Sequence, residues 1–142
     1  MKTRATSFYS DFSVRQLVQR SGSFARLACE PFGGGGGGTG FHVRRIGSGE
    51  THFNAHKSDN FACRLPPGES LDETELFSTL RLNVERALHG SEAQIVDSGS
   101  TGSANFYFAY TLKNVRGRVE ISGKRGVAGY YNISANLSES GS

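Results

Sequence analysis

Large apolar residues recur at nearly every second position from 106 to 122, on both sides of the pair Lys113-Asn114. This alternation is typical of two strands that each bury one face, and two polar residues between such segments predict a tight hairpin. A turn at Lys113-Asn114 places Leu112 opposite Val115, and the large apolar side chains then fall on one face. A slip of one residue would move them to the other face, so the register is strongly constrained. The sequence therefore predicts an antiparallel sheet with one buried face.

A further strand over 130–138 extends this predicted sheet after a longer loop. Its inward side chains are Tyr131, Ile133, Ala135 and Leu137. Continuing the register across the loop predicts that Val115 lies opposite Leu137. It also places Gly117 opposite Ala135, and these two small residues would form a low spot that a helix could cross closely.

Residues 70–89 carry the strongest helix signal in the chain. Ser70 and Glu73 stand in capping-box spacing, and Gly90 follows the segment as a stop signal. Apolar residues repeat on one helical face at Leu76, Phe77, Leu80, Val84, Ala87 and Leu88. Because such a face must be buried, we expect the helix to pack on the apolar side of the sheet.

Shorter extended segments precede this helix. Candidate strands cover 41–46, 51–56 and 61–65, and turn-forming residues at 47–49 and 57–60 separate them. The fold class that these elements predict is α+β. One amphipathic helix packs on an antiparallel β-meander of about four strands, preceded by short strands and a flexible Gly-rich N-terminal arm.

The sequence predicts an arm, one domain and a tail. Residues 1–40 form the arm, in which a short helix is expected over 10–20 and a run of six glycines begins at Gly33. Consecutive glycines lose much backbone entropy when they are ordered, so the run predicts a flexible linker. Residues 41–138 form a single small α+β domain, and residues 139–142 form a disordered tail.

Two cysteines, Cys29 and Cys63, allow at most one disulfide and form no CxxC metal or redox pattern. Cys63 alternates with apolar neighbours, which favours a buried thiol, and whether the two cysteines pair stays open. Leu27-Ala28-Cys29 faintly resembles the end of a bacterial lipoprotein signal, although the preceding stretch is too polar. With no long apolar run for a transmembrane helix, we expect a soluble protein of unknown compartment. A cell-envelope lipoprotein anchored at Cys29 is the alternative if translation starts upstream.

The string Ile-Val-Asp-Ser-Gly-Ser at 95–100 raises the question of catalysis. It resembles the active-site signature of the pepsin- and retropepsin-type aspartic peptidases. That resemblance implies a catalytic carboxylate at Asp97 that shares a proton with a second Asp. The resemblance is confined to this string, a helix precedes it, and no downstream string completes the site. We therefore interpret Asp97 as the first residue of a polar loop, 97–103, and expect no enzymatic activity.

No motif predicts a cofactor or a metal site. The glycine run contains G-x-G-x-x-G, but a dinucleotide site needs a strand before the glycines and a helix after them, and residues 41–43 are strand-like. His52 and His56 are four residues apart, without an acidic residue placed as in zinc-binding helices. Solvated histidines are the favoured interpretation.

The outward positions of the predicted sheet carry arginine and tyrosine. The candidate contact face consists of Tyr107, Arg116, Arg118, Lys124, Arg125 and Tyr130. Such side chains can stack bases and contact phosphates, although a solvated sheet face explains the same residues. The net charge is +3, and residues 1–64 hold nine Lys and Arg against four acidic residues.

The resulting functional prediction is a small non-catalytic binding or structural module, tethered by its Gly-rich arm, with an unknown protein as its partner. The alternative is a nucleic-acid-binding domain that uses the Arg-rich arm and the outer sheet face.

Overall fold

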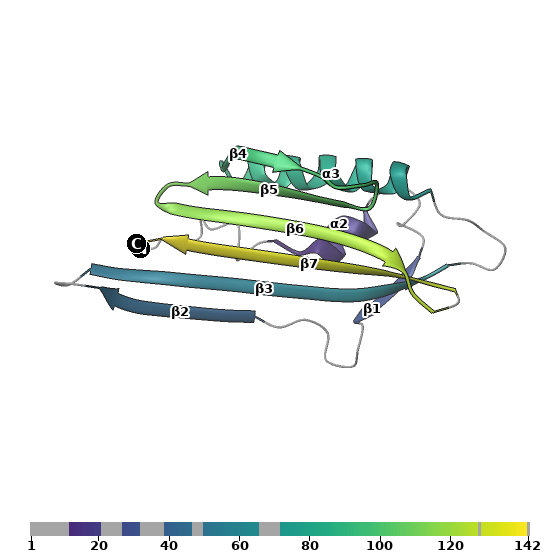
Figure 1. Cartoon of the computed structure of the whole chain (residues 1–142), viewed down its shortest axis with the longest axis horizontal. Coiled ribbons are helices and arrows are strands. Elements are labelled where there is room, and N and C mark those ends of the chain that lie inside the picture. The colour runs from purple at the N-terminus through teal and green to yellow at the C-terminus, as the bar shows by residue number, and fades with distance from the viewer. Residues whose placement is uncertain are drawn as a thin grey trace.

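The computed structural model describes residues 12–20, 27–31, 39–46, 50–65, 72–127 and 129–141, which form one sheet with helices on one of its faces (Figure 1). In chain order the elements are α2 (Val14–Gln19), β1 (Ala28–Pro31), β2 (Thr39–Ile46), β3 (Glu50–Arg64), α3 (Glu73–Gly90), β4 (Gln94–Gly99), β5 (Asn105–Leu112), β6 (Val115–Arg125) and β7 (Tyr130–Gly141). All paired strands are antiparallel. The predicted α+β class is therefore confirmed.

The sheet is larger than the predicted meander of about four strands. Over the described residues it has seven strands, with a main path β1-β3-β7-β6-β5-β4 and β2 beside β3. β3 pairs with β7 through twelve residue pairs along one edge, and its other edge is shared by β2 and β1. The strands before α3 therefore belong to the same sheet as the meander after it.

β3 is one continuous strand of 15 residues, so the predicted turn at 57–60 is wrong. Lys57 lies opposite Leu137 and Asn60 lies opposite Ser134, within the β3–β7 pairing. The segment is polar partly because alternate side chains point to the face of the sheet that no described helix covers, where water is the neighbour. Pairing with β7 thus overrode the turn preference of the individual residues.

The β5–β6 hairpin has the predicted register, with Leu112 opposite Val115 and Lys113 in the turn at a φ of 57°. Gly117 does not form the predicted low spot under a helix. A Cβ added at Gly117 would lie 2.2 Å from the ring of Tyr110, so the tyrosine ring occupies the space above the glycine. Close approach of this ring is the physical reason for a glycine in the middle of β6.

The β6–β7 register differs from the prediction by four residues. Val115 lies opposite Gly141, and Leu137 lies opposite Val119. A displacement of four keeps each side chain on its predicted face, because side chains alternate with a period of two. The error came from the expected loop, which was too long: β6 continues to Arg125.

α3 begins at Glu73, and its N-cap is Asp72 instead of the predicted Ser70, which lies outside the described residues. The Asp72 carboxylate accepts a hydrogen bond from the backbone N–H of Glu75 at 3.1 Å, which satisfies one of the free donors of the first turn. The Tyr131 hydroxyl donates to the Glu73 carboxylate at 2.7 Å and so ties the start of the helix to β7. The buried face of α3 is largely the predicted one, with Leu76, Phe77, Leu80, Val84 and Leu88.

Two segments assigned to the flexible arm belong to the folded unit. α2 is the helix expected over 10–20, shortened to six residues, and it buries Val14 and Val18 in the core. β1 pairs with the end of β3, and a disulfide joins Cys29 to Cys63. Cys63 is therefore not the free thiol that the sequence favoured. Tertiary packing of a few apolar side chains outweighed the polar composition of this part of the chain.

The remaining predictions outside the central domain concern the lipid anchor at Cys29, the C-terminal tail and the Gly-rich linker. The sulfur that would carry a lipid at Cys29 is bonded to Cys63, which contradicts the lipid-anchor alternative. β7 continues to Gly141, so most of the predicted tail is strand. The glycines at 33–38 lie outside the described residues. In the described part of the chain, no helix combines the length and apolar character needed to span a membrane.

Candidate functional site

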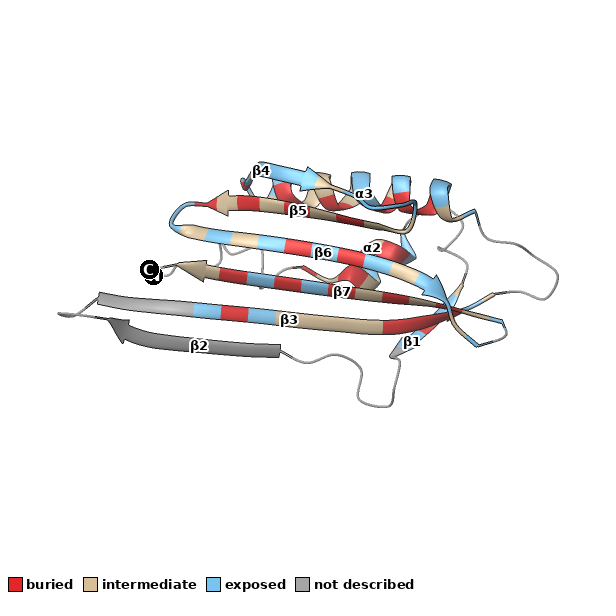
Figure 2. Ribbon diagram, viewed as in Figure 1, coloured by how far each residue is buried: buried red, intermediate tan, exposed pale blue. Residues whose placement is uncertain are grey.

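The two faces of the sheet differ in composition. α2 and α3 pack on one side, which we call the covered face; on the other, the open face, no described helix lies (Figures 1 and 2). The covered face of β7 carries Tyr131, Ile133, Ala135 and Leu137, each at most 2% exposed. The alternate positions on the open face carry Asn132, Ser134, Asn136, Ser138 and Ser140. Strand alternation therefore separates a packed apolar face from a polar strip.

This polar strip forms the floor of a shallow trough, which we call the β7 trough. Longer side chains flank it on the neighbouring strands, among them Arg116, Arg118, Glu120 and Lys124 on β6, and Asn54, His56 and Asn60 on β3. The register places His56, Ser138 and Arg118 in one row across the three strands. A hydrogen bond from Ser58 Oγ to Asn136 Oδ1 (2.9 Å) joins the β3 side of the trough to its floor, between two hollows.

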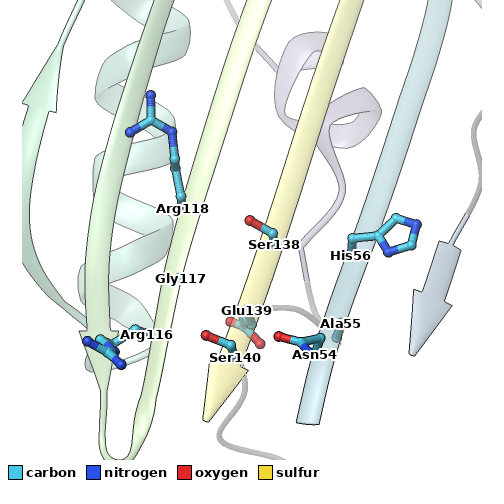
Figure 3. A pocket seen from close by; sticks show the side chains of 9 residues that line it. All are labelled: Asn54, Ala55, His56, Arg116, Gly117, Arg118, Ser138, Glu139 and Ser140. Carbon is cyan, nitrogen blue, oxygen red and sulfur yellow. The ribbon is translucent and has the colours of Figure 1, made fainter. Parts of the chain in front are cut away.

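The first hollow has a volume of about 360 Å³ and lies at the end of β7 (Figure 3). Its floor is formed by Ser138 and Ser140, with Arg116 on β6 at one rim and His56 on β3 at the other. Within the described part of the chain, Arg116 has no ion-pair partner. A guanidinium beside hydroxyl groups can receive an anion through charge-assisted hydrogen bonds.

The second hollow, of about 330 Å³, lies near the other end of the trough. Asn60, Lys124, Asn132 and Ser134 contribute polar groups to its lining. Asn132 Oδ1 is buried and, among the described residues, has no hydrogen-bond donor. Lys124 likewise has no ion pair there. This hollow therefore offers a cation and an unfilled acceptor side by side.

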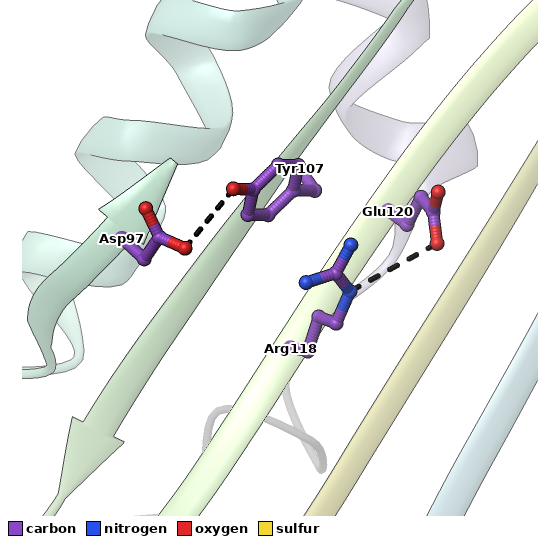
Figure 4. Close-up of polar contacts among 4 residues, drawn as sticks. All are labelled: Asp97, Tyr107, Arg118 and Glu120. Carbon is purple, nitrogen blue, oxygen red and sulfur yellow. Dashed lines mark hydrogen bonds and ion pairs between the residues drawn. The ribbon is translucent and has the colours of Figure 1, made fainter. Parts of the chain in front are cut away.

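Tyr107 and Arg118 are held by their neighbours on the open face (Figure 4). The Tyr107 hydroxyl donates to Asp97 Oδ2 at 3.0 Å, and this hydrogen bond raises the pKa of the Tyr107 phenol. The Arg118 guanidinium lies 4.0 Å from the centre of the Tyr107 ring, in cation–π geometry, and its Nε is 4.0 Å from Glu120 Oε1. The Tyr107 ring and Arg118 are thus already paired with each other.

The register places most of the predicted contact residues on the open face: Tyr107, Arg116, Arg118, Lys124 and Tyr130. Arg64 lies over the Tyr130 ring at 5.8 Å, a second pairing of arginine with tyrosine. Arg125 is the exception. It lies opposite Tyr131, whose side chain is on the covered face, and so points to that side at the end of β6.

Sequence reasoning missed the serines of β7 and the β3 side of the trough. Ser or Asn alternates with Ile, Ala and Leu over 132–138, which is a signal for a polar strip. The flanking residues Asn54 and His56 could not be placed, because the continuous β3–β7 pairing was not recognised. The trough exists only when these two strands lie side by side.

Asp97 lies inside β4 and does not begin a loop. Its Oδ1 accepts a hydrogen bond from the Ser98 backbone N–H at 2.9 Å, and its Oδ2 accepts one from Tyr107. Both carboxylate oxygens therefore have local donors. Across the ranges that the structure describes, no group of three or more His, Cys, Asp or Glu side chains is placed to hold a metal ion.

The chain matches no protein-family model, no curated protein and no solved structure. The geometry of the open face is therefore the basis for a functional proposal.

Proposed function

We propose that this protein is a non-catalytic binding module that holds a hydrophilic, negatively charged ligand in the β7 trough. The observation that carries the proposal is the pair of hollows in line along β7, each with a largely polar lining that includes cationic side chains. The lining of the first hollow also includes Glu139, whose buried carboxylate accepts a hydrogen bond from the Tyr110 hydroxyl. Arg116 lines the first hollow and Lys124 lines the second. Neither has an ion-pair partner among the described residues. Carboxylate, sulfate or phosphate groups complement these two cations.

The composition of the trough supports a role beyond folding. Asn is depleted in β-strands, whereas β-branched residues are favoured there. The open-face positions of β7 from 132 to 140 nevertheless hold only Asn and Ser. A solvated sheet face does not require this series, whereas hydrogen bonding to a polar ligand accounts for it.

The same face gives less support to the two partners that the sequence suggested. Binding of single-stranded nucleic acid relies on bases that stack on aromatic rings. The rings of Tyr107 and Tyr130 are each approached by an arginine of the same sheet. A protein interface usually has an apolar or aromatic centre, and the trough floor is Ser and Asn. A protein partner and nucleic acid both stay predictions.

The proposal includes an oxidising compartment as the place where the module folds. Disulfides form and persist mainly in secreted, periplasmic and cell-surface proteins. The bond between Cys29 and Cys63 joins the N-terminal strand to the body of the sheet, so its formation completes the fold.

An NMR titration of the isotope-labelled full chain with inorganic phosphate or sulfate at low ionic strength tests the proposed surface. We expect saturable shifts of the backbone amides at 116–118 and 138–140, and no saturable shifts along α3. Arg116→Gln should abolish the shifts around the first hollow. Arg86→Gln removes the same charge from an exposed position of α3 and should leave them intact.

Two results would contradict the proposal. One is the absence of any saturable shift in the trough. The other is an equal loss of anion binding in Arg116→Gln and Arg86→Gln, which would show that only net charge matters.

A further inference from the structure

The second hollow sets a requirement that a simple anion does not meet. Asn132 Oδ1 is a buried acceptor without a donor among the described residues. An ionised carboxylate or sulfate has no hydrogen to donate to it. Lys124, in the same lining, favours an acidic group. A ligand that satisfies both residues carries hydroxyl donors beside its acidic groups.

The rest of the trough also combines hydrogen-bond donors with hydrogen-bond acceptors. Serine hydroxyls and asparagine amides both donate and accept hydrogen bonds, and so do the hydroxyls of a sugar ring. Ser138 and Ser140 lie in the first hollow, and Ser134 lies in the second. The floor between them is Asn136, bridged to Ser58. Sugar hydroxyls therefore find partners along the whole strand.

Apolar anchors lie elsewhere on the described surface. The exposed large hydrophobic side chains are Leu82 on α3, Val96 on the edge strand β4 and Val127 in the β6–β7 loop. None of them lines either hollow. The surface thus favours an acidic sugar chain over a peptide with apolar anchors.

The two cations also indicate the length of the ligand. Arg116 and Lys124 lie on the same face of β6, eight residues apart. At a rise of about 3.3 Å per residue, their backbones are separated by roughly 26 Å. One monosaccharide cannot contact both, whereas an extended chain that follows β7 can.

We propose that the ligand is an acidic polysaccharide built from uronic acid units. Its chain follows the β7 trough, with carboxylates at Arg116 and Lys124 and a hydroxyl that donates to Asn132 Oδ1. This inference rests on the proposed function and specifies its ligand.

Calorimetry of the full chain with galacturonate and with oligogalacturonates of increasing length tests the inference. Affinity should rise with length until the chain spans both hollows. The methyl-esterified oligomer keeps its hydroxyls but loses its charges, and it should bind at least about tenfold more weakly, as the loss of charge-assisted hydrogen bonds implies.

Three variants and one control test where the oligosaccharide binds. Arg116→Gln and Lys124→Gln should each weaken the long oligomer about tenfold, the scale expected for one charged contact. Arg86→Gln on α3 is the matched control and should bind as the original chain does. Asn132→Ala should weaken the long oligomer severalfold without lowering the unfolding midpoint of the free protein, because Oδ1 has no hydrogen-bond partner among the described residues.

The outcomes separate this inference from the proposed function. Inorganic anions could shift the amides around the first hollow while the affinity for oligogalacturonates does not depend on their length, or is the same for the esterified oligomer. This result would contradict the polysaccharide as the ligand and leave the proposed binding surface standing. Tighter binding of polyglutamate or of a single-stranded oligonucleotide than of the long oligogalacturonate would also overturn it. Absence of binding to the oligogalacturonates and to inorganic anions alike would overturn both proposals.

Discussion

The covered and open faces of β7 share one backbone but obey different constraints. On the covered face, Ile133 and Leu137 are buried against the helices and neighbouring strands, where a change of one methylene is felt. On the open face, Ser134 and Ser138 have no such packing to satisfy. The covered face is therefore constrained by packing, whereas the open face carries the proposed binding site.

The largest difference in folding stability between substitutions on the two faces should come from two neighbouring residues of β7. Leu137→Ala removes a side chain that is 2% exposed and should destabilise the fold by about 2–5 kcal/mol. Ser138→Ala, one residue further and on the open face, should change stability by less than about 0.5 kcal/mol. Urea unfolding of both variants measures the difference. Equal losses would show that the open face is also part of the folding core.

The disulfide at the edge of the covered face should have the next largest effect. It links residues 34 apart in sequence. Replacement of Cys29 and Cys63 by Ala should cost about 2–4 kcal/mol, because the unfolded chain gains freedom. Urea unfolding with and without reductant measures the same quantity in the original chain. An unchanged unfolding midpoint after full reduction would contradict this expectation.

A third test probes close packing on the covered face at Gly117. Gly117→Ala places a Cβ within 2.2 Å of the Tyr110 ring and should cost about 1–3 kcal/mol. The control is Gly90→Ala, where nothing lies within 4 Å of the added Cβ. Thermal unfolding should show a lower midpoint only for the Gly117 variant. A midpoint equal to that of the control would mean that the ring moves aside freely.

Alkaline pH should affect stability through Tyr131 on the covered face more than through Tyr107 on the open face. Burial and the hydrogen bond to Glu73 raise the pKa of Tyr131 above its ordinary value of about 10. The unfolded chain therefore ionises first, so the stabilising contribution is fully present below pH about 10 and is lost as the pH rises further. Tyr131→Phe should reduce this alkaline loss of stability, as urea unfolding at a series of pH values would show. An unchanged pH dependence would argue against the burial of this phenol.

The smallest effect is expected at Tyr107 on the open face. The hydrogen bond to Asp97 raises the pKa of this phenol, so Asp97→Asn should lower that pKa. The fold should be little affected, because exposed polar contacts contribute little to stability. Site-specific NMR of the tyrosine ring carbons measures the pKa. A strong drop in unfolding midpoint would instead make Asp97 a structural residue of the β4 edge.

The covered face was the more predictable one. Alternation in β5 and β6 was strong enough to assign the register of their hairpin, and the periodicity of α3 identified its buried face. β3 was divided wrongly, because its central residues from Lys57 to Asn60 have turn-forming character that only pairing with β7 overrides. The N-cap was also missed, since Asp72 and Ser70 both have capping side chains and the sequence does not rank them.

The candidate site was only partly predictable for a related reason. Alternation assigned Arg116 and Arg118 to the outer face, and Lys124 was expected in the adjacent loop, but alternation does not reveal a trough. The trough needs β3 beside β7, and the Ser58–Asn136 hydrogen bond joins residues 78 apart in sequence. The shape of the site is therefore a product of long-range pairing, for which a local pattern carries no signal.

The disulfide has a further consequence for the covalent topology of the chain. Because it joins Cys29 to Cys63, the segment between them, including the glycine run and β2, is part of a closed covalent ring. A single proteolytic cut inside this ring would open the loop without separating the chain into two molecules. The cut protein would keep its full mass until a reductant cleaved the bridge, and only then would an N-terminal fragment carrying α2 and β1 be free to leave the sheet.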